Sequence, residues 1–173
     1  MITISAVLKN SFRNIKLVGL LLASIGVQGC SDRAGAESQK DSPSPEKVFQ
    51  LFGGEEHRFE DIKAPFVLMN YWASWCKPCV KEIPELNALN DNPNTAVYAY
   101  NFDQLEGDAL LAEADKFQLK LPMMLNEPAP MFNEKPPAAL PATLVVNTQT
   151  GEQQWLMGAQ TKQGILAALN MEK

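Results

Sequence analysis

Residues 66–86 read FVLMNYWASWCKPCVKEIPEL, and Cys76 and Cys79 inside this stretch decide the interpretation of the whole chain. The apolar run 66–71 is typical of a buried strand, and the apolar spacing after the cysteines predicts a helix. Cys76 is therefore expected at a helix N-terminus, where free N–H groups and the helix dipole stabilise a thiolate. Because the thiolate attacks disulfides, the motif predicts redox chemistry, with Cys79 as the resolving thiol.

Closely spaced cysteines also occur in metal sites and structural cross-links. A zinc site needs two further ligands, but Cys30 is the only other cysteine and His57 the only histidine. A structural disulfide over so short a loop adds little stability. A copper-binding module that uses Cys76 and Cys79 with His57 remains an alternative of a different class. The redox interpretation is the stronger one, because it needs no further residue.

The block from Asn70 to Cys76, followed by Cys79, Glu82 and Pro84, resembles the thioredoxin superfamily, and within it the TlpA/ResA-like thiol-disulfide oxidoreductases. Leu140-Pro141-Ala142-Thr143 is a second matching stretch, and the layout extends over 48–173. The resemblance implies an α/β, thioredoxin-like three-layer fold. A central mixed sheet would be flanked by helices and would carry a TlpA-type insertion.

The resemblance also implies which residues surround the cysteines. It places a cis-proline, here Pro141, across the active site from the cysteine pair. The cis bond would turn the backbone of the preceding residue, Leu140, toward the substrate chain. Trp75, Lys77 and Pro78 adjoin the cysteines. We expect these three residues and Leu140 to contact the partner protein, and Lys77 and Pro78 to tune the redox couple as well.

Glu82 is the predicted proton acceptor for the inner thiol. Thioredoxin has an aspartate six residues before its first cysteine, but this chain has Asn70 there, which cannot titrate. Glu82 follows Cys79 by three residues, about one helical turn. A carboxyl buried at that place would have a raised pKa and could take the proton of Cys79. From spacing alone an exposed helix glutamate is an equal alternative, and the resemblance favours the proton acceptor.

The first 29 residues are typical of an export signal. Lys9, Arg13 and Lys16 are their only charges, and the apolar run 17–27 follows. This run is shorter than the about 20 residues of a membrane-spanning helix. Val27-Gln28-Gly29-Cys30 resembles a bacterial lipobox, which implies a lipid on Cys30. An ordinary cleaved signal followed by an unmodified cysteine is the alternative.

The remaining sequence divides into a tether and one domain. Residues 30–47 are predicted to be a flexible tether, because 31–47 contain no large apolar residue, and 48–173 form the domain. Three of the fifteen basic residues lie in the signal, so the rest carries twelve against twenty acidic residues, a net charge of −8. This charge argues against nucleic-acid binding. Strands are expected at 48–52, 66–71, 96–102, 121–125, 142–146 and 154–157, and helices after the cysteines, at 107–119 and at 161–171.

These expectations combine into one functional hypothesis. The protein would be a lipid-anchored, monomeric reductase of disulfides on the periplasmic side of the bacterial envelope, without cofactor or bound metal. A disulfide-forming oxidase with the same residues is the alternative. The resemblance implies protein substrates such as apocytochrome c or metallochaperones, and a DsbD-like membrane protein as electron donor. It does not decide between the inner and the outer membrane.

Overall fold

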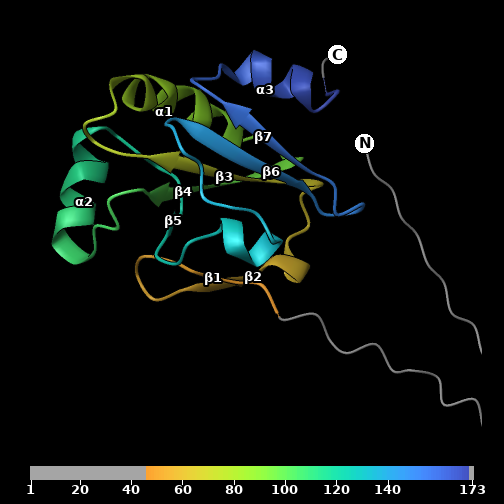
Figure 1. Cartoon of the computed structure of the whole chain (residues 1–173), viewed down its shortest axis with the longest axis horizontal. Coiled ribbons are helices and arrows are strands. Elements are labelled where there is room, and N and C mark those ends of the chain that lie inside the picture. The colour runs from red at the N-terminus through yellow and green to blue at the C-terminus, as the bar shows by residue number, and fades with distance from the viewer. Residues whose placement is uncertain (1–45, 172–173) are drawn as a thin grey trace, which may run out of the picture. The chain divides into compact units, whose positions relative to one another are not determined.

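The computed structural model describes residues 46–171, which contain one central sheet, a separate strand pair and three α-helices (Figure 1). The predicted signal, Cys30 and residues 31–45 of the tether lie outside the described residues. The strands are β1 (Val48–Gln50), β2 (Glu56–Arg58), β3 (Phe66–Trp72), β4 (Thr95–Asn101), β5 (Met123–Met124), β6 (Ala142–Asn147) and β7 (Gln153–Met157). The helices are α1 (Lys77–Asn90), α2 (Gly107–Lys116) and α3 (Lys162–Ala168), with 3₁₀ turns η1 (Phe59–Asp61) and η2 (Ala129–Phe132).

The central sheet is mixed, and its strand order is β5-β4-β3-β6-β7. β3 runs parallel to β4 and antiparallel to β6, while β6 and β7 form a hairpin. Helices α1 and α3 cover one face of the sheet, and the β1–β2 pair lies with η2 on the other (Figure 1). This is the three-layer α/β fold that the sequence predicted.

The position of β3 at the centre of the sheet explains its unbroken apolar sequence. Successive side chains of a strand point to opposite faces, and both faces of β3 are covered. Leu68 and Trp72 pack into the cluster beneath α1, whereas Val67, Met69 and Tyr71 pack into the cluster beneath the β1–β2 pair. Asn70 is the polar exception, and it is 2% exposed on the α1 side.

Several elements differ in extent from their predictions. β2 was not expected, because its sequence Glu-His-Arg is polar, but it pairs antiparallel with β1. α2 ends at Lys116 and α3 at Ala168, so both are shorter than the apolar pattern indicated. The connection 126–140 contains η2, which Tyr71 helps to hold, because its hydroxyl accepts a hydrogen bond from the Ala129 N–H.

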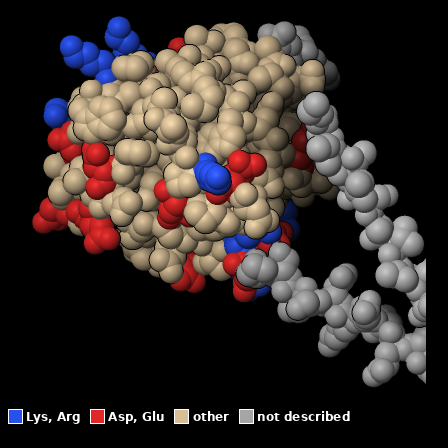
Figure 2. Space-filling model, viewed as in Figure 1, with Lys and Arg blue, Asp and Glu red and all other residues tan. Residues whose placement is uncertain are grey.

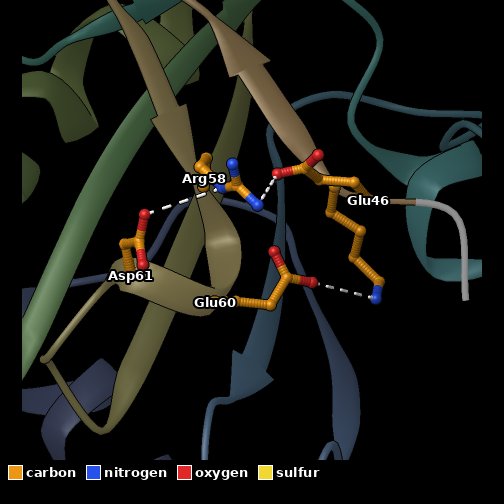
Figure 3. A network of polar contacts seen from close by, with 5 residues as sticks. Glu46, Arg58, Glu60 and Asp61 are labelled. Atoms are coloured by element: carbon orange, nitrogen blue, oxygen red, sulfur yellow. Dashed lines mark ion pairs between the residues drawn. The ribbon is translucent and has the colours of Figure 1, made fainter. Parts of the chain in front are cut away.

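The start of the described chain is attached to the β1–β2 pair. Figure 3 shows Arg58 between Glu46 and Asp61, with Glu60 reaching an ammonium group, which belongs to Lys47. The carbonyl of Lys47 also accepts a hydrogen bond from Phe59 N–H at 2.9 Å. The end of the predicted tether therefore contacts the domain, although exposed ion pairs of this kind add at most about 1 kcal/mol each.

Candidate active site

Cys76 and Cys79 form a disulfide at the start of α1, with their Cα atoms 5.3 Å apart. Cys76 is the N-cap of the helix, and its Sγ accepts a hydrogen bond from the Cys79 N–H at 3.3 Å. Pro78 lies in the first turn, where a proline loses no helical hydrogen bond. Cys76 and Pro78 thus cap the helix start locally, and the Cys79 N–H points at the outer sulfur.

The two cysteines differ in exposure. Cys76 is 5% exposed and Cys79 is 1% exposed, and both belong to the cluster beneath α1. The neighbouring Lys77 and Pro78 are exposed. A partner disulfide would therefore reach Cys76 before Cys79.

Pro141 lies at the same end of the sheet as the disulfide. The Leu140–Pro141 peptide bond is cis, as the resemblance implied. Pro141 directly precedes Ala142, which pairs with Tyr71 near the end of β3, and the cysteines follow that end. Leu140 is half-buried and packs against the cluster that contains both cysteines.

Glu82 lies within the interior, with 1% of its surface exposed. Its Oε1 accepts a hydrogen bond from Gln160 N–H at 3.1 Å, and its Oε2 accepts one from the Asn70 amide at 3.4 Å. The same amide nitrogen donates to Thr143 Oγ1 at 2.9 Å. Burial raises the pKa of the Glu82 carboxyl to about 7, although the bonds from Gln160 and Asn70 favour the charged form. The group is therefore able to exchange a proton near neutral pH.

Trp75 stands on the surface beside Cys76, with 62% of its area exposed. Its indole N–H donates to both carboxylate oxygens of Asp103, at 2.8 and 3.1 Å. Asp103 comes directly after Phe102, which is 38% exposed and whose N–H bonds the Trp72 carbonyl. These contacts fix an aromatic surface next to the outer sulfur.

The charges around this surface are of both signs. Figure 2, drawn from the same side as Figure 1, shows Lys or Arg side chains protruding beside the start of α1 and acidic side chains over α2. α1 carries Lys77 and Lys81 in its first turns, and α2 carries Asp108, Glu113 and Asp115. Two basic residues of α1 thus lie near the disulfide, together with the Asp103 carboxylate that binds Trp75.

His57 does not join the cysteines. Its Nδ1 lies 2.8 Å from the hydroxyl of Tyr98, in the layer on the sheet face opposite α1. Within residues 46–171, no three His, Cys, Asp or Glu side chains gather closely enough to hold a metal ion. The copper-binding alternative therefore has no ligand set in this part of the chain.

Three partners in the site were not predicted from the sequence. Thr143 reaches Asn70 only because β3 and β6 pair in a register that places these two residues opposite each other. Gln160 acts through its backbone N–H, which has no side-chain signature. Asp103 lies 28 residues beyond Trp75. Of these, only Thr143 belonged to a stretch that the sequence had marked.

Comparisons with known proteins agree with this geometry. Residues 43–151, more than half of the chain, match the AhpC/TSA family. The thiol-disulfide oxidoreductase ResA of Geobacillus kaustophilus (strain HTA426) is 29% identical over 129 residues, which cover 72% of each protein.

Solved structures show the same fold. A DsbF homologue from Corynebacterium diphtheriae superposes with a TM-score of 0.61 at 17% identity, covering 85% of this chain and all of that one. StoA from Bacillus subtilis gives a TM-score of 0.56 at 19% identity, covering 70% of this chain and 94% of that one. With its thioredoxin-like fold and a Cys-Lys-Pro-Cys disulfide at a helix start, the chain belongs to the AhpC/TSA family and is a thiol-disulfide oxidoreductase.

Proposed function

We propose that this protein reduces disulfides of other proteins on the extracytoplasmic side of a bacterial membrane, with Cys76 and Cys79 as its redox couple. The observation that carries the proposal is the placement of Cys76 at the N-cap of α1, more exposed than Cys79 and accepting an N–H bond at its sulfur. A thiolate at this position is stabilised and is the more exposed of the two sulfurs, and Cys79 is close enough to resolve an intermediate.

The reaction begins with the reduced pair. The Cys76 thiolate attacks one sulfur of the partner disulfide, forms a mixed disulfide and releases a partner thiolate. The Cys79 thiolate then attacks Cys76 Sγ, which closes the Cys76–Cys79 disulfide and releases the second partner thiolate. Two electrons pass to the partner, and both partner thiolates take up protons. The cycle needs an external dithiol to reduce the pair again.

Glu82 serves the second step in this proposal. Cys79 is nearly inaccessible, so its proton needs an acceptor within the interior. Glu82 lies one turn further along α1, and its pKa of about 7 suits proton transfer at neutral pH. It takes the proton of Cys79 and passes it on after the mixed disulfide is resolved.

Two features favour reduction over disulfide formation. A strong oxidant stabilises its reduced form, as DsbA does with a thiolate pKa of about 3.5. Here Lys77 is exposed, so its charge acts through water, and no histidine lies between the cysteines. We expect a potential near that of thioredoxin, about −270 mV, rather than that of DsbA, about −120 mV.

The decisive measurement is the redox equilibrium of the purified domain with glutathione and with dithiothreitol. A potential at the reducing end, together with reduction of insulin by the dithiol form, supports the reductase. A potential near −120 mV would make the protein a disulfide-forming oxidase instead.

The N-terminal sequence and the family support the proposed location and partners. A lipid on Cys30 would anchor the monomer to a membrane of the cell envelope, with its active site on the periplasmic side. No helix within residues 46–171 is long and apolar enough to cross a bilayer. Replacing Cys30 with serine should release the protein from the membrane fraction, and retention would indicate an uncleaved signal.

Apocytochrome c and metallochaperones are the proposed substrate classes, and a DsbD-like membrane protein is the proposed electron donor. Pro141, Leu140 and Trp75 are proposed to contact the substrate chain, with Lys77 and Pro78 beside the sulfur. Capturing partners with a Cys79→Ser variant would identify the substrate, because the mixed disulfide with Cys76 then persists.

A further inference from the structure

Two carboxylates of α1 hold the segment that leads into α3. Glu82 Oε1 accepts the N–H of Gln160 at 3.1 Å, and Glu85 Oε2 accepts the N–H of Lys162 at 2.9 Å. Residues three apart on a helix share a face, and alternate N–H groups of an extended chain point the same way. Thr161, between the two donors, has extended dihedrals of −103° and 158°. Both carboxylates therefore lie on one side of α1, and the two N–H groups that they accept point the same way.

The two hydrogen bonds lie in different surroundings. Glu82 is 1% exposed, whereas Glu85 is half-buried at the rim of the α1–α3 contact. The Lys162 ammonium adds a bond to the Ala88 carbonyl at 2.9 Å. The bond from the Lys162 N–H to Glu85 thus attaches the start of α3 to α1, two residues beyond the Gln160 N–H that binds Glu82.

We propose that Glu85 is a positioning residue: by binding the Lys162 N–H, it keeps the Gln160 N–H on the Glu82 carboxylate. The consequence rests on the function proposed for Glu82. The Gln160 N–H stabilises the charged carboxylate, which accepts the proton of Cys79. If residues 160–162 shift away from α1, Glu82 loses the Gln160 N–H that lowers its pKa, while burial continues to raise it. The carboxyl then keeps its proton to a higher pH.

The groups that face Glu82 make this donor important. Asn70 of β3 is its only other hydrogen-bond donor within residues 46–171, at the longer distance of 3.4 Å, and the same amide nitrogen also donates to Thr143 Oγ1 of β6. On its own helix it is flanked by Cys79 and Glu85, one turn away on either side. The ammonium of Lys162 is directed to the Ala88 carbonyl, and no ion pair to Glu82 occurs among the described residues.

A simple effect of charge predicts the opposite result. Glu85 is a carboxylate one turn from Glu82, so removing its negative charge alone would make Glu82 easier to ionise and lower its pKa. Removing a positioning contact raises that pKa instead. The sign of the change therefore separates the two explanations.

The experiment follows the Glu82 carboxyl by carbon-13 NMR against pH in the oxidised protein. We expect Glu85→Ala to move its titration midpoint up by about half a unit, roughly threefold in the acid constant. Glu85→Gln retains an acceptor oxygen and should leave the midpoint at the wild-type value or slightly below. A midpoint that falls equally in both variants, or does not move in Glu85→Ala, overturns the proposal.

A second pair of variants removes the donor and keeps the charge of Glu85. Lys162 is the first residue of α3, where proline is well tolerated, and extended Thr161 suits the position before a proline. Lys162→Pro removes the N–H and should raise the Glu82 midpoint as Glu85→Ala does. Lys162→Ala loses the ammonium group and its bond to Ala88, as Lys162→Pro also does, but it keeps the backbone N–H and should give a lower midpoint than Lys162→Pro. Equal midpoints in these two variants contradict the positioning role.

The pH profile of disulfide exchange separates this inference from the proposed function. If the Glu82 midpoint rises in Glu85→Ala and the pH–rate profile moves with it, the positioning role of Glu85 and the proton-acceptor role of Glu82 are both supported. If the midpoint rises and the profile stays, Glu85 positions the segment but Glu82 does not accept the proton of Cys79.

Discussion

The side-chain amide of Asn70 donates to the Glu82 carboxylate across the interface between β3 and α1, at 3.4 Å. Asn70 occupies the position for which the resemblance to thioredoxin implies a titrating aspartate, and the buried carboxylate here belongs to the facing helix. Among residues 46–171, Glu82 is the one buried carboxyl, one helical turn beyond Cys79, with neutral donors around it. The pH dependence of this protein should reflect that one group.

Replacing Glu82 with glutamine should change how stability depends on pH. Below pH 4.5 the carboxyl is protonated in both the folded and the unfolded chain. Between pH 4.5 and about 7 only the folded chain keeps the proton, so folding becomes less favourable as the pH rises through this window. The difference is about 3 kcal/mol at most, and Glu82→Gln should not show it. Urea unfolding of the oxidised wild-type and Glu82→Gln proteins at pH 4.5 and pH 8 measures this difference. An equal change in the free energy of unfolding between the two pH values in both proteins would contradict the prediction.

Replacing Asn70 with aspartate should create a coupled carboxyl pair. Two buried carboxylates this close cannot both ionise cheaply, so they should titrate in two well-separated steps, with the upper apparent pKa above that of Glu82 in the wild type. The variant should lose stability above neutral pH and regain it at pH 5. Thr143→Val, which removes the other partner of Asn70 without adding a charge, is the matched control. A single titration step near the wild-type midpoint in Asn70→Asp would refute the coupling.

The two cysteines should have unequal roles. Cys79→Ser should accumulate mixed disulfides with partner proteins, because Cys76 is the more exposed sulfur and lies at the helix N-cap. Cys76→Ser should lose disulfide reduction altogether. Alkylation of the reduced wild-type protein at pH 7, followed by mass spectrometry, tests the assignment directly. Selective labelling of Cys79 would reverse it.

Asp103 should affect protein substrates more than small ones. Its carboxylate holds the indole of Trp75 beside the disulfide, and without it the exposed ring is free to rotate. Asp103→Ala should raise the KM for a protein disulfide by about threefold to tenfold, an effect of about 1 kcal/mol, since the contact is exposed. Reduction of a small aromatic disulfide should change little. Trp75→Phe, which keeps a ring but loses the N–H, should behave similarly, and an equal loss on both substrates would exclude a docking role.

The sequence by itself determined the elements whose cause is local. The apolar run before the cysteines indicated a strand covered on both faces, and β3 is that strand. Cys76 at a helix start and the strands at 142–146 and 154–157 were likewise predicted, because the apolar patterns that indicate helices and strands act over a few positions. Glu82 was placed one turn after Cys79 by helical spacing alone.

Tertiary structure decided which residues meet across elements. The antiparallel register of β3 and β6 brings Thr143 to Asn70, and the packing of α3 on α1 brings Gln160 and Lys162 to the two carboxylates. β2 forms despite its polar sequence because β1 offers it backbone partners. Sequence periodicity shows which face of an element is buried but not what that face meets. The surroundings that raise the pKa of Glu82 therefore depend on how strands and helices far apart in the chain pack together.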